Sequence, residues 1–321
     1  MQNKQPSKLS FIAKEKSRIC IDSMYYYQFC AVDSAGKSIS YSVDASPSWV
    51  LFNVAGHSLS GKPEKPGQYM IHISASTVDS TVHQRFMLTV YDSATSNILT
   101  LGNSITNGTN KYNSYRRALW QLLHKGNYDF DFIGSWSKHH MGSEFPDPDF
   151  DMDHDGHSGW KAADLLAQPE WDKQRGNIHD WIETYTPSIV LMELGTNEVF
   201  QCTPVKTALN DICSVIDIIR QKNPRVKIFV AQIPPLGAQW VNKKLCGNGI
   251  SYGQAVKNFN KQLAVRVSAK NTITSRVTLV DQYSGIHAST DLYDDIHPNE
   301  VGEEKMAEKW YKAIHKYLRK L

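Results

Sequence analysis

The chain has 321 residues, of which 41% are hydrophobic and 21% are charged, and its formal net charge is +3. This length suits two domains of about 100–200 residues each. So small a net charge argues against nucleic acid or an anionic membrane as partner. No apolar run approaches the ~20 residues that a membrane helix needs. Residues 1–8 lack the apolar core of a signal peptide, so secretion or display at the cell surface would require a leader outside the given sequence.

Residues 1–94 have the pattern of an all-β domain. Alternating apolar runs at 69–74 and 85–90 are separated by turn residues, for example at 33–36 and 61–67. No segment in this part has a convincing helical period. The pattern predicts a small antiparallel β-sandwich of roughly seven strands, followed by a polar, turn-prone boundary at 92–97.

Residues 95–321 alternate between strand and helix patterns, which is typical of βαβ units with a parallel sheet between two layers of helices. The strands are expected at 98–101, 130–134, 188–194, 227–232 and 277–280. The helices are expected at 115–124, 162–166, 178–185, 205–221, 252–269 and 300–321. A sheet of this kind gathers the loops that follow its strands at one edge.

Ser104 follows the first of these strands, where Gly102 and Asn103 break the apolar run. Ligands of open α/β sheets bind at the carboxyl ends of the strands, and a nearby helix amino terminus can hold a negative oxygen. We therefore interpret Ser104 as a nucleophile. Taken alone, a serine at this place could equally cap a helix.

Three further loops carry residues that a serine esterase would require, namely Gly159, Asn197 and His297. Together with Ser104, and in the same order, they resemble the four signature positions of the SGNH hydrolases, also called GDSL esterases. The resemblance covers residues 97–321. It implies a flavodoxin-like three-layer α/β/α domain in which His297 is the base. Ser104 N–H, Gly159 N–H and the Asn197 amide would form the oxyanion hole.

The carboxylate that completes the catalytic triad is expected at Asp294, three residues before His297. Asp295 is the alternative. The sequence departs from the family pattern at Asn103, where the family usually has aspartate, and at Glu198, where aspartate is common. Asp295 also replaces a frequent glycine. These changes bear on substrate and rate more than on the type of reaction.

Four stretches, at 113–119, 155–160, 279–282 and 291–294, resemble carbohydrate esterase family three, which contains acetylxylan esterases. The resemblance implies an O-acetylated polysaccharide as substrate. Trp160, Trp240 and Tyr293 are candidates for stacking on sugar rings, although such aromatics more often pack in a core or at a rim.

Two other functions stay open. A lipid-directed esterase, such as a lysophospholipase or acyltransferase, would need an apolar groove for its acyl chain. A glycan-binding or adhesion protein could carry an inactive hydrolase domain. Residues 27–29, 33–36, 47–50, 59–63, 67–69 and 84–86 resemble cadherin-like, immunoglobulin-like modules of bacterial surface proteins. Such a module implies a spacer, or a contact with a glycan or protein.

The proposed chemistry needs no metal or cofactor. Asp151, Asp153 and Asp155 before Gly156 match the first half of a calcium loop, but Ala162 stands where its bidentate glutamate belongs. A solvated acidic loop is favoured over a structural calcium site.

Among the five cysteines, Cys202 and Cys246 fall on loops at the expected catalytic edge and could form a disulfide if the protein is exported. Cys213 is expected to be buried in its helix. The pairing of Cys20 and Cys30 is left open.

Overall fold

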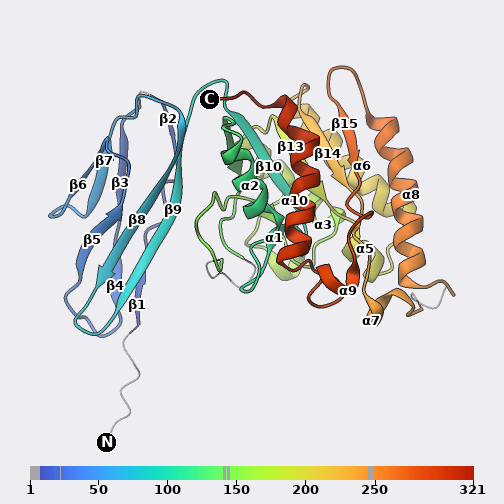
Figure 1. The fold of residues 1–321 in the computed structure, drawn as a ribbon, viewed down its shortest axis with the longest axis horizontal. Helices are drawn as coiled ribbons and strands as arrows, with labels where there is room; N and C mark the ends of the chain where they lie inside the picture. The colour runs from blue at the N-terminus through green and yellow to red at the C-terminus, as the bar shows by residue number, and fades with distance from the viewer. Residues whose placement is uncertain (1–7, 22, 140–141, 143–144, 245–248) are drawn as a thin grey trace, which may run out of the picture. The chain divides into compact units, whose positions relative to one another are not determined.

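The structure is a computed structural model that describes residues 8–21, 23–139, 142, 145–244 and 249–321. The chain divides into two compact units (Figure 1). The first runs to Thr95 and includes Pro148–Asp151; the second consists of Ser96–Asp147 and Met152–Leu321.

The first unit is built from β-strands, as predicted. Its larger sheets have the orders β2-β9-β8-β5 and β3-β7-β6, and β1 pairs with β4. The described residues contain more strands than the roughly seven expected, because several span only three or four residues and show no alternation. One pair, β2 with β9, is parallel. The bounds are β1 (Leu9–Phe11), β2 (Arg18–Cys20), β3 (Tyr25–Gln28), β4 (Ala31–Asp33), β5 (Ser40–Ala45), β6 (Val50–Asn53), β7 (Ser58–Gly61), β8 (Gly67–Ser76) and β9 (Thr81–Tyr91).

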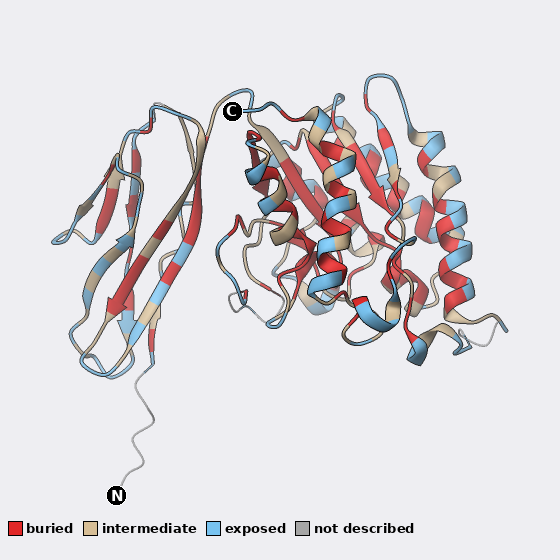
Figure 2. Ribbon diagram, viewed as in Figure 1, coloured by how far each residue is buried: buried red, intermediate tan, exposed pale blue. Residues whose placement is uncertain are grey.

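The core of this unit follows from alternation along its strands. Ile71 and Ile73 on β8 and Phe86 on β9 are buried against Tyr25 and Tyr27 of β3. His72, between these isoleucines, and Arg85, next to Phe86, point to the opposite face of the sheet. Figure 2 shows buried residues on both strands together with intermediate or exposed ones.

The second unit has a parallel sheet of order β11-β10-β13-β14-β15, with β12 pairing to the end of β10. This order places the first strand between the second and the third, as in flavodoxin-like folds, and confirms the expected fold class. Each of the five predicted strands lies within two residues of its predicted bounds. The bounds are β10 (Ser96–Gly102), β11 (Phe130–Ile133), β12 (Asp155–Gly156), β13 (Ile189–Glu193), β14 (Lys227–Ala231) and β15 (Val277–Val280).

Helices cover both faces of this sheet. One face, carrying Val190 and Met192 of β13, packs against helices α3, α4, α6 and α8. Helices α2 and α10 lie together on the other side, in front of the sheet in Figure 1. The bounds of the longer helices are α2 (Tyr115–Lys125), α3 (Ala162–Leu166), α4 (Ile178–Thr184), α6 (Val205–Lys222), α8 (Tyr252–Lys270) and α10 (Glu300–Ile314).

The predicted last helix, 300–321, is too long. Helix α10 ends at Ile314 and a 3₁₀ turn follows at His315–Tyr317. The remaining residues are extended because they pair with the segment before β11: Asp129 N–H donates to the carbonyl of Arg319 at 2.8 Å, and the Arg319 guanidinium forms an ion pair with the buried Asp129 carboxylate.

Four short helices were not predicted because no helical period can be recognised in their four or five residues. They are α1 (Ser104–Asn107), α5 (Thr196–Phe200), α7 (Ala238–Val241) and α9 (Ala288–Asp291). Each follows a strand of the parallel sheet, so they form part of its carboxyl edge.

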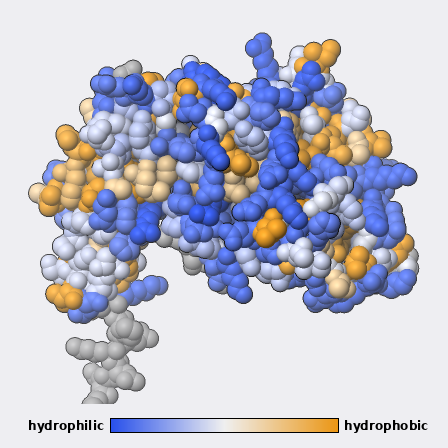
Figure 3. Space-filling model, viewed as in Figure 1, coloured by the Kyte–Doolittle hydropathy of each residue, from blue (hydrophilic) through white to orange (hydrophobic). Residues whose placement is uncertain are grey.

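The large hydrophobic side chains exposed on the second unit are dispersed over several elements, for example Val265 on α8, Ile273 after it and Val301 on α10. On the face that Figure 3 shows, hydrophobic residues of this unit are interspersed with hydrophilic ones. In the described part of the chain, every helix is too short or too polar to cross a bilayer.

Candidate active site

The turn after β10 presents Ser104 at the edge of the sheet. Gly102 is required there, because a Cβ on this residue would lie 2.4 Å from Thr106 Oγ1 and 2.6 Å from the carbonyl oxygen of Glu193. Asn103 then caps α1, with its Oδ1 accepting a hydrogen bond from Ile105 N–H at 2.9 Å. The first residue of α1 is therefore Ser104, whose side chain is partly buried.

Ser104, His297 and Asp294 form a hydrogen-bonded chain. Ser104 Oγ lies 2.8 Å from His297 Nε2, although 193 positions separate the two residues. His297 Nδ1 lies 2.7 Å from Asp294 Oδ2. Since a carboxylate can only accept, the imidazole donates from Nδ1 and presents an unprotonated Nε2 to the serine hydroxyl. This arrangement can take a proton from Ser104.

The neighbouring carboxylates differ in their contacts. Asp294 Oδ1 accepts hydrogen bonds from His297 N–H at 2.7 Å and Ile296 N–H at 3.1 Å, which fixes the loop around the imidazole. Burial raises the pKa of Asp294, but the hydrogen bonds from His297 outweigh it, so that the pKa is lowered and the carboxylate stays ionised. Asp295 instead accepts from Gln239 N–H, at 3.2 Å, and lies against Gly237.

The expected oxyanion donors lie at the same edge of the sheet, Ser104 in α1, Gly159 in a turn and Asn197 in α5. Gly159 has φ +82°, a conformation that favours glycine. The Asn197 side chain donates one N–H to the carbonyl of Trp160 at 2.8 Å, and its second N–H is left for another acceptor. Within the described residues, neither Ser104 N–H nor Gly159 N–H donates to another backbone group. The role of these three donors remains a prediction.

Two buried carboxyl groups lie beneath this edge. Glu198, in α5, accepts a hydrogen bond from Ala162 N–H at 2.7 Å and so ties the Asn197 helix to α3. Glu193, at the end of β13, is fully buried. Burial and the charge of Glu198 raise the pKa of Glu193 to about 8, and an interaction with the Asn103 side chain partly opposes them. An aspartate at position 103 would place a negative charge in this fully buried site, beside the protonated Glu193, which gives a physical reason for the neutral Asn103.

The expectation that Trp160 stacks on substrate is wrong. Its side chain is fully buried, and its indole N–H donates to Asp172 at 3.0 Å. Trp171 was not anticipated, and it is 66% exposed. A Cβ built on Gly159 would lie 3.6 Å from Cη2 of Trp171. Trp171 lies in a polar 3₁₀ turn (Glu170–Asp172), and the sequence around it shows no pattern that would have predicted a tryptophan next to Gly159.

The other two aromatic candidates are partly exposed. Tyr293 stacks between the His297 imidazole, at 5.8 Å between ring centroids, and Tyr112, at 4.7 Å. Trp240 packs edge-on against Phe200 at 5.1 Å and has the Lys243 ammonium over its face at 4.1 Å. One face of Trp240 is therefore already occupied.

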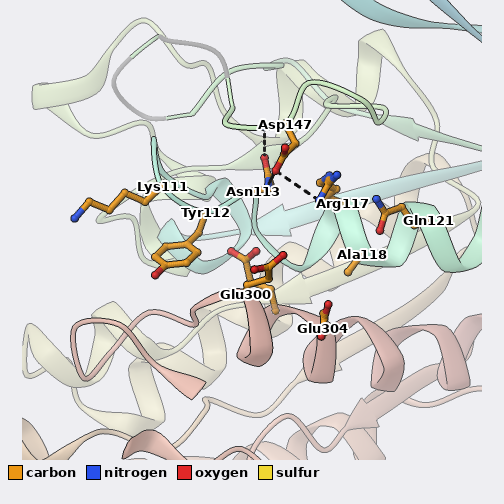
Figure 4. Close-up of a pocket in the computed structure, with 10 residues that line it drawn as sticks. Lys111, Tyr112, Asn113, Arg117, Ala118, Gln121, Asp147, Glu300 and Glu304 are labelled. Carbon is orange, nitrogen blue, oxygen red and sulfur yellow. Dashed lines mark hydrogen bonds and ion pairs between the residues drawn. The ribbon is translucent and has the colours of Figure 1, made fainter. Parts of the chain in front are cut away.

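Tyr112 also lines a small polar cavity of about 110 Å³ (Figure 4). On the far wall of the cavity, Asp147 Oδ2 accepts a hydrogen bond from Asn113 Nδ2 at 2.9 Å and lies 3.5 Å from Arg117 Nη1. Glu303, on the opposite wall, accepts from Ser114 N–H at 2.7 Å, and burial raises its pKa to about 8. The stacked rings of Tyr112 and Tyr293 join this polar cavity to the imidazole of His297.

In the loop considered for calcium, Asp155 is engaged with protein groups. Its Oδ1 accepts from Ser135 N–H at 3.0 Å, and its Oδ2 accepts from the Tyr185 hydroxyl. A calcium ion would have to replace these hydrogen bonds. The calcium site remains a hypothesis.

Cys202 is disulfide-bonded, and Cys246, its expected partner, lies outside the described residues. Cys20, Cys30 and Cys213 are free thiols. Cys213 is only half-buried, contrary to the expectation, because it lies between the buried Ile212 and the exposed side of α6.

The second unit matches the family described as GDSL-like lipase/acylhydrolase over residues 100–305. The chain belongs to this family. Residues 22–91 match the family described as "Putative Ig domain". Both resemblances expected from the sequence are thereby confirmed, and the loops bearing Ser104, Asn197 and His297 fall within the matched GDSL region.

Relatives of this GDSL hydrolase include a multidomain esterase from Ruminococcus flavefaciens, 31% identical over 232 residues. The match covers 69% of this chain but only 29% of that relative. Among solved structures, an acetyl esterase with an acetate ion is 26% identical, with a TM-score of 0.56 and coverage of 69% of this chain and 97% of that one. A family 3 carbohydrate esterase from Talaromyces cellulolyticus gives the same four values.

The fully buried Glu193 predicts how stability varies with pH. The folded carboxyl keeps its proton up to a pKa of about 8, whereas the unfolded one, at 4.5, has lost it. The free energy of unfolding therefore falls between these pH values, by up to about 1.4 kcal/mol per pH unit. Glu193→Gln removes this ionisation, so we expect its melting temperature to decline less than that of the wild type between pH 5 and 8.

Glu183→Gln is the control, because Glu183 is exposed on α4. Its melting temperature should follow the wild-type pH dependence. Identical slopes for Glu193→Gln and the wild type would contradict the assignment of a protonated, buried Glu193.

Proposed function

We propose that this protein removes O-acetyl groups from a carbohydrate, with Ser104 as nucleophile, His297 as base and Asp294 as the residue that orients the base. The observation that carries this proposal is the hydrogen-bonded chain from Ser104 Oγ through the imidazole to Asp294, with distances of 2.8 Å and 2.7 Å. A serine hydroxyl is a weak nucleophile until an adjacent base accepts its proton.

In the proposed reaction, Ser104 Oγ attacks the acetyl carbonyl and His297 Nε2 takes the hydroxyl proton. The charge on the imidazole is stabilised by the ionised Asp294. The negative carbonyl oxygen is held by Ser104 N–H, Gly159 N–H and the second N–H of Asn197. His297 then protonates the departing sugar oxygen. Water attacks the acetyl-serine with the same histidine as base, releasing acetate and restoring Ser104.

A short acyl group and a carbohydrate alcohol are favoured by three observations. The solved relatives include an acetyl esterase with an acetate ion and a family 3 carbohydrate esterase. The exposed hydrophobic residues of the second unit are dispersed, whereas a long acyl chain needs a continuous apolar groove. The exposed Trp171 beside Gly159 offers a flat apolar face of the kind that a sugar ring covers.

We further propose that the protein functions outside the cytoplasm. The disulfide at Cys202 supports this placement, because disulfides persist in oxidising compartments. For the immunoglobulin-like unit we propose a role as spacer or as a contact with a glycan.

The roles in the triad are tested by substitution. Ser104→Ala should abolish acetate release. Asp294→Asn should lower kcat by about 10²–10⁴-fold, because the amide cannot stabilise the charged imidazole. Asp295→Asn is the matched control and should retain activity within a few-fold, since asparagine tolerates the φ of +66° at this position. Acetate release from acetylated xylan is the measurement. Full activity in Ser104→Ala, or an equal loss in both aspartate variants, would refute these assignments.

The size of the acyl group is tested with p-nitrophenyl esters of acetate and octanoate. We expect kcat/KM to be at least about tenfold higher for the acetyl ester, because the exposed large hydrophobic residues in the described part of the second unit are dispersed over several elements. Acetate release from a panel of acetylated glycans would then identify the alcohol. Faster cleavage of the octanoyl ester would favour the lipid-directed alternative.

Trp171→Ala tests the sugar-stacking surface. Losing one aromatic face should raise KM for an acetylated polysaccharide about three- to tenfold, while kcat/KM for p-nitrophenyl acetate, which carries no sugar, stays within about twofold. A companion variant, Trp240→Ala, removes an aromatic ring that already packs against Phe200 and Lys243. Unchanged KM for the polysaccharide in Trp171→Ala would exclude Trp171 from the substrate surface.

A further inference from the structure

A cluster of side chains of the types that can hold a metal ion lies in the immunoglobulin-like unit. Asp44, His72 and His83 come from the adjacent strands β5, β8 and β9, and one ligand atom of each lies within 4.8 Å of those of the other two. His72 and His83 belong to the face of the sheet opposite the buried Ile71 and Ile73.

A β-bulge brings the aspartate to this face. Val43 pairs with Ile73 and Ala45 pairs with His72, so that Asp44 is the extra residue between two paired positions. A bulge of this kind redirects a side chain out of the regular alternation. Ser74, between the two histidines, donates its hydroxyl proton to Asp44 Oδ2. The carboxylate is thereby oriented toward the imidazoles.

The distances fit tetrahedral coordination. His72 Nε2 lies 3.2 Å from Asp44 Oδ2 and 3.2 Å from His83 Nδ1. In a tetrahedral zinc site with bonds of about 2.0–2.1 Å, neighbouring ligand atoms lie roughly 3.3 Å apart. The third pair of ligand atoms lies within 4.8 Å, so the three atoms could bind one ion once Arg85 has moved away, leaving a fourth position for water.

The positions of the protons at this cluster leave two acceptor atoms facing each other, and a cation could bind between them. Arg85 Nε–H donates to His72 Nε2 at 3.1 Å, so the proton of this neutral imidazole is on Nδ1. His72 Nε2 and Asp44 Oδ2 thus face each other at 3.2 Å as two acceptors with no proton between them.

We infer that Asp44, His72 and His83 bind a divalent transition-metal ion of the zinc type on the immunoglobulin-like unit, separately from the ester-hydrolysing site. Two imidazole nitrogens and one carboxylate oxygen suit Zn²⁺ better than Ca²⁺ or Mg²⁺, which prefer oxygen ligands. Ser74 Oγ contacts two of the ligand atoms, Asp44 Oδ2 and, at 2.8 Å, His83 Nδ1, so its hydroxyl must give up the contact with the imidazole when the ion binds. Arg85 competes with the metal for His72 Nε2 and must swing away when the ion binds.

The test is a calorimetric titration of Zn²⁺ into the chelator-treated full chain. The wild type should bind one Zn²⁺ ion per chain. His83→Ala and His72→Ala should each weaken the affinity for this ion by at least about tenfold. Arg85→Ala should tighten binding, because it removes the competing donor and its positive charge. A non-specific surface site would be unaffected by Arg85→Ala. His179→Ala, which removes an exposed imidazole from α4 of the other unit, is the control and should bind as the wild type does.

Cobalt supplies an independent readout. Co²⁺ bound at this cluster should give the intense visible absorption of a tetrahedral complex, and His83→Ala should lose it. The inference is overturned if the wild type binds no Zn²⁺, or if His72→Ala and His83→Ala bind it with wild-type affinity. Ester hydrolysis is a separate measurement, so neither result depends on the proposed activity.

Discussion

The hydrogen bonds that hold the His297 imidazole between Ser104 and Asp294 are the constraint on which the rest of this site depends. They join the end of the sheet's first strand to the loop before its last helix, 193 positions apart. The sheet order makes this possible, because β10 lies inside the sheet and both segments reach its carboxyl edge. On the histidine side, buried Asp291 forms an ion pair with Lys305 of α10 and accepts from His287 N–H, which anchors the loop.

The polar groups beneath the edge have a cost in stability. Glu193 is fully buried with a raised pKa, and Glu198 is buried beside it. Carboxyl groups in such places are retained when they fix something else. Glu198 holds α3 through Ala162 N–H, and α3 follows the loop that carries Gly159. Asn103, neutral where the family usually has aspartate, caps α1 without adding a negative charge to this buried site. The side chains at the carboxyl edge of the sheet are thus held in place at the expense of the free energy of unfolding.

Much of this arrangement was predictable from the sequence, and the exceptions have physical reasons. The apolar runs of β13 and β14 and the periodic faces of α6 and α8 are strong local patterns, so their positions were found. Ser104 and Asn197 each follow an apolar strand of this sheet, and His297 precedes the last helix. Trp160 and Trp171 could not be distinguished, because burial of an aromatic depends on tertiary packing and not on its neighbours in sequence. The cluster of Asp44, His72 and His83 could not be predicted from the sequence either, because it is created by a β-bulge and by the pairing of three strands.

The most direct measurement is covalent labelling with a fluorophosphonate, which reacts with serines that an adjacent base has activated. The account predicts one label per chain, on the peptide that contains Ser104, with hydrolysis lost in proportion to labelling and with little labelling in a His297→Ala variant. Labelling at another serine, or full activity after complete modification of Ser104, would contradict it.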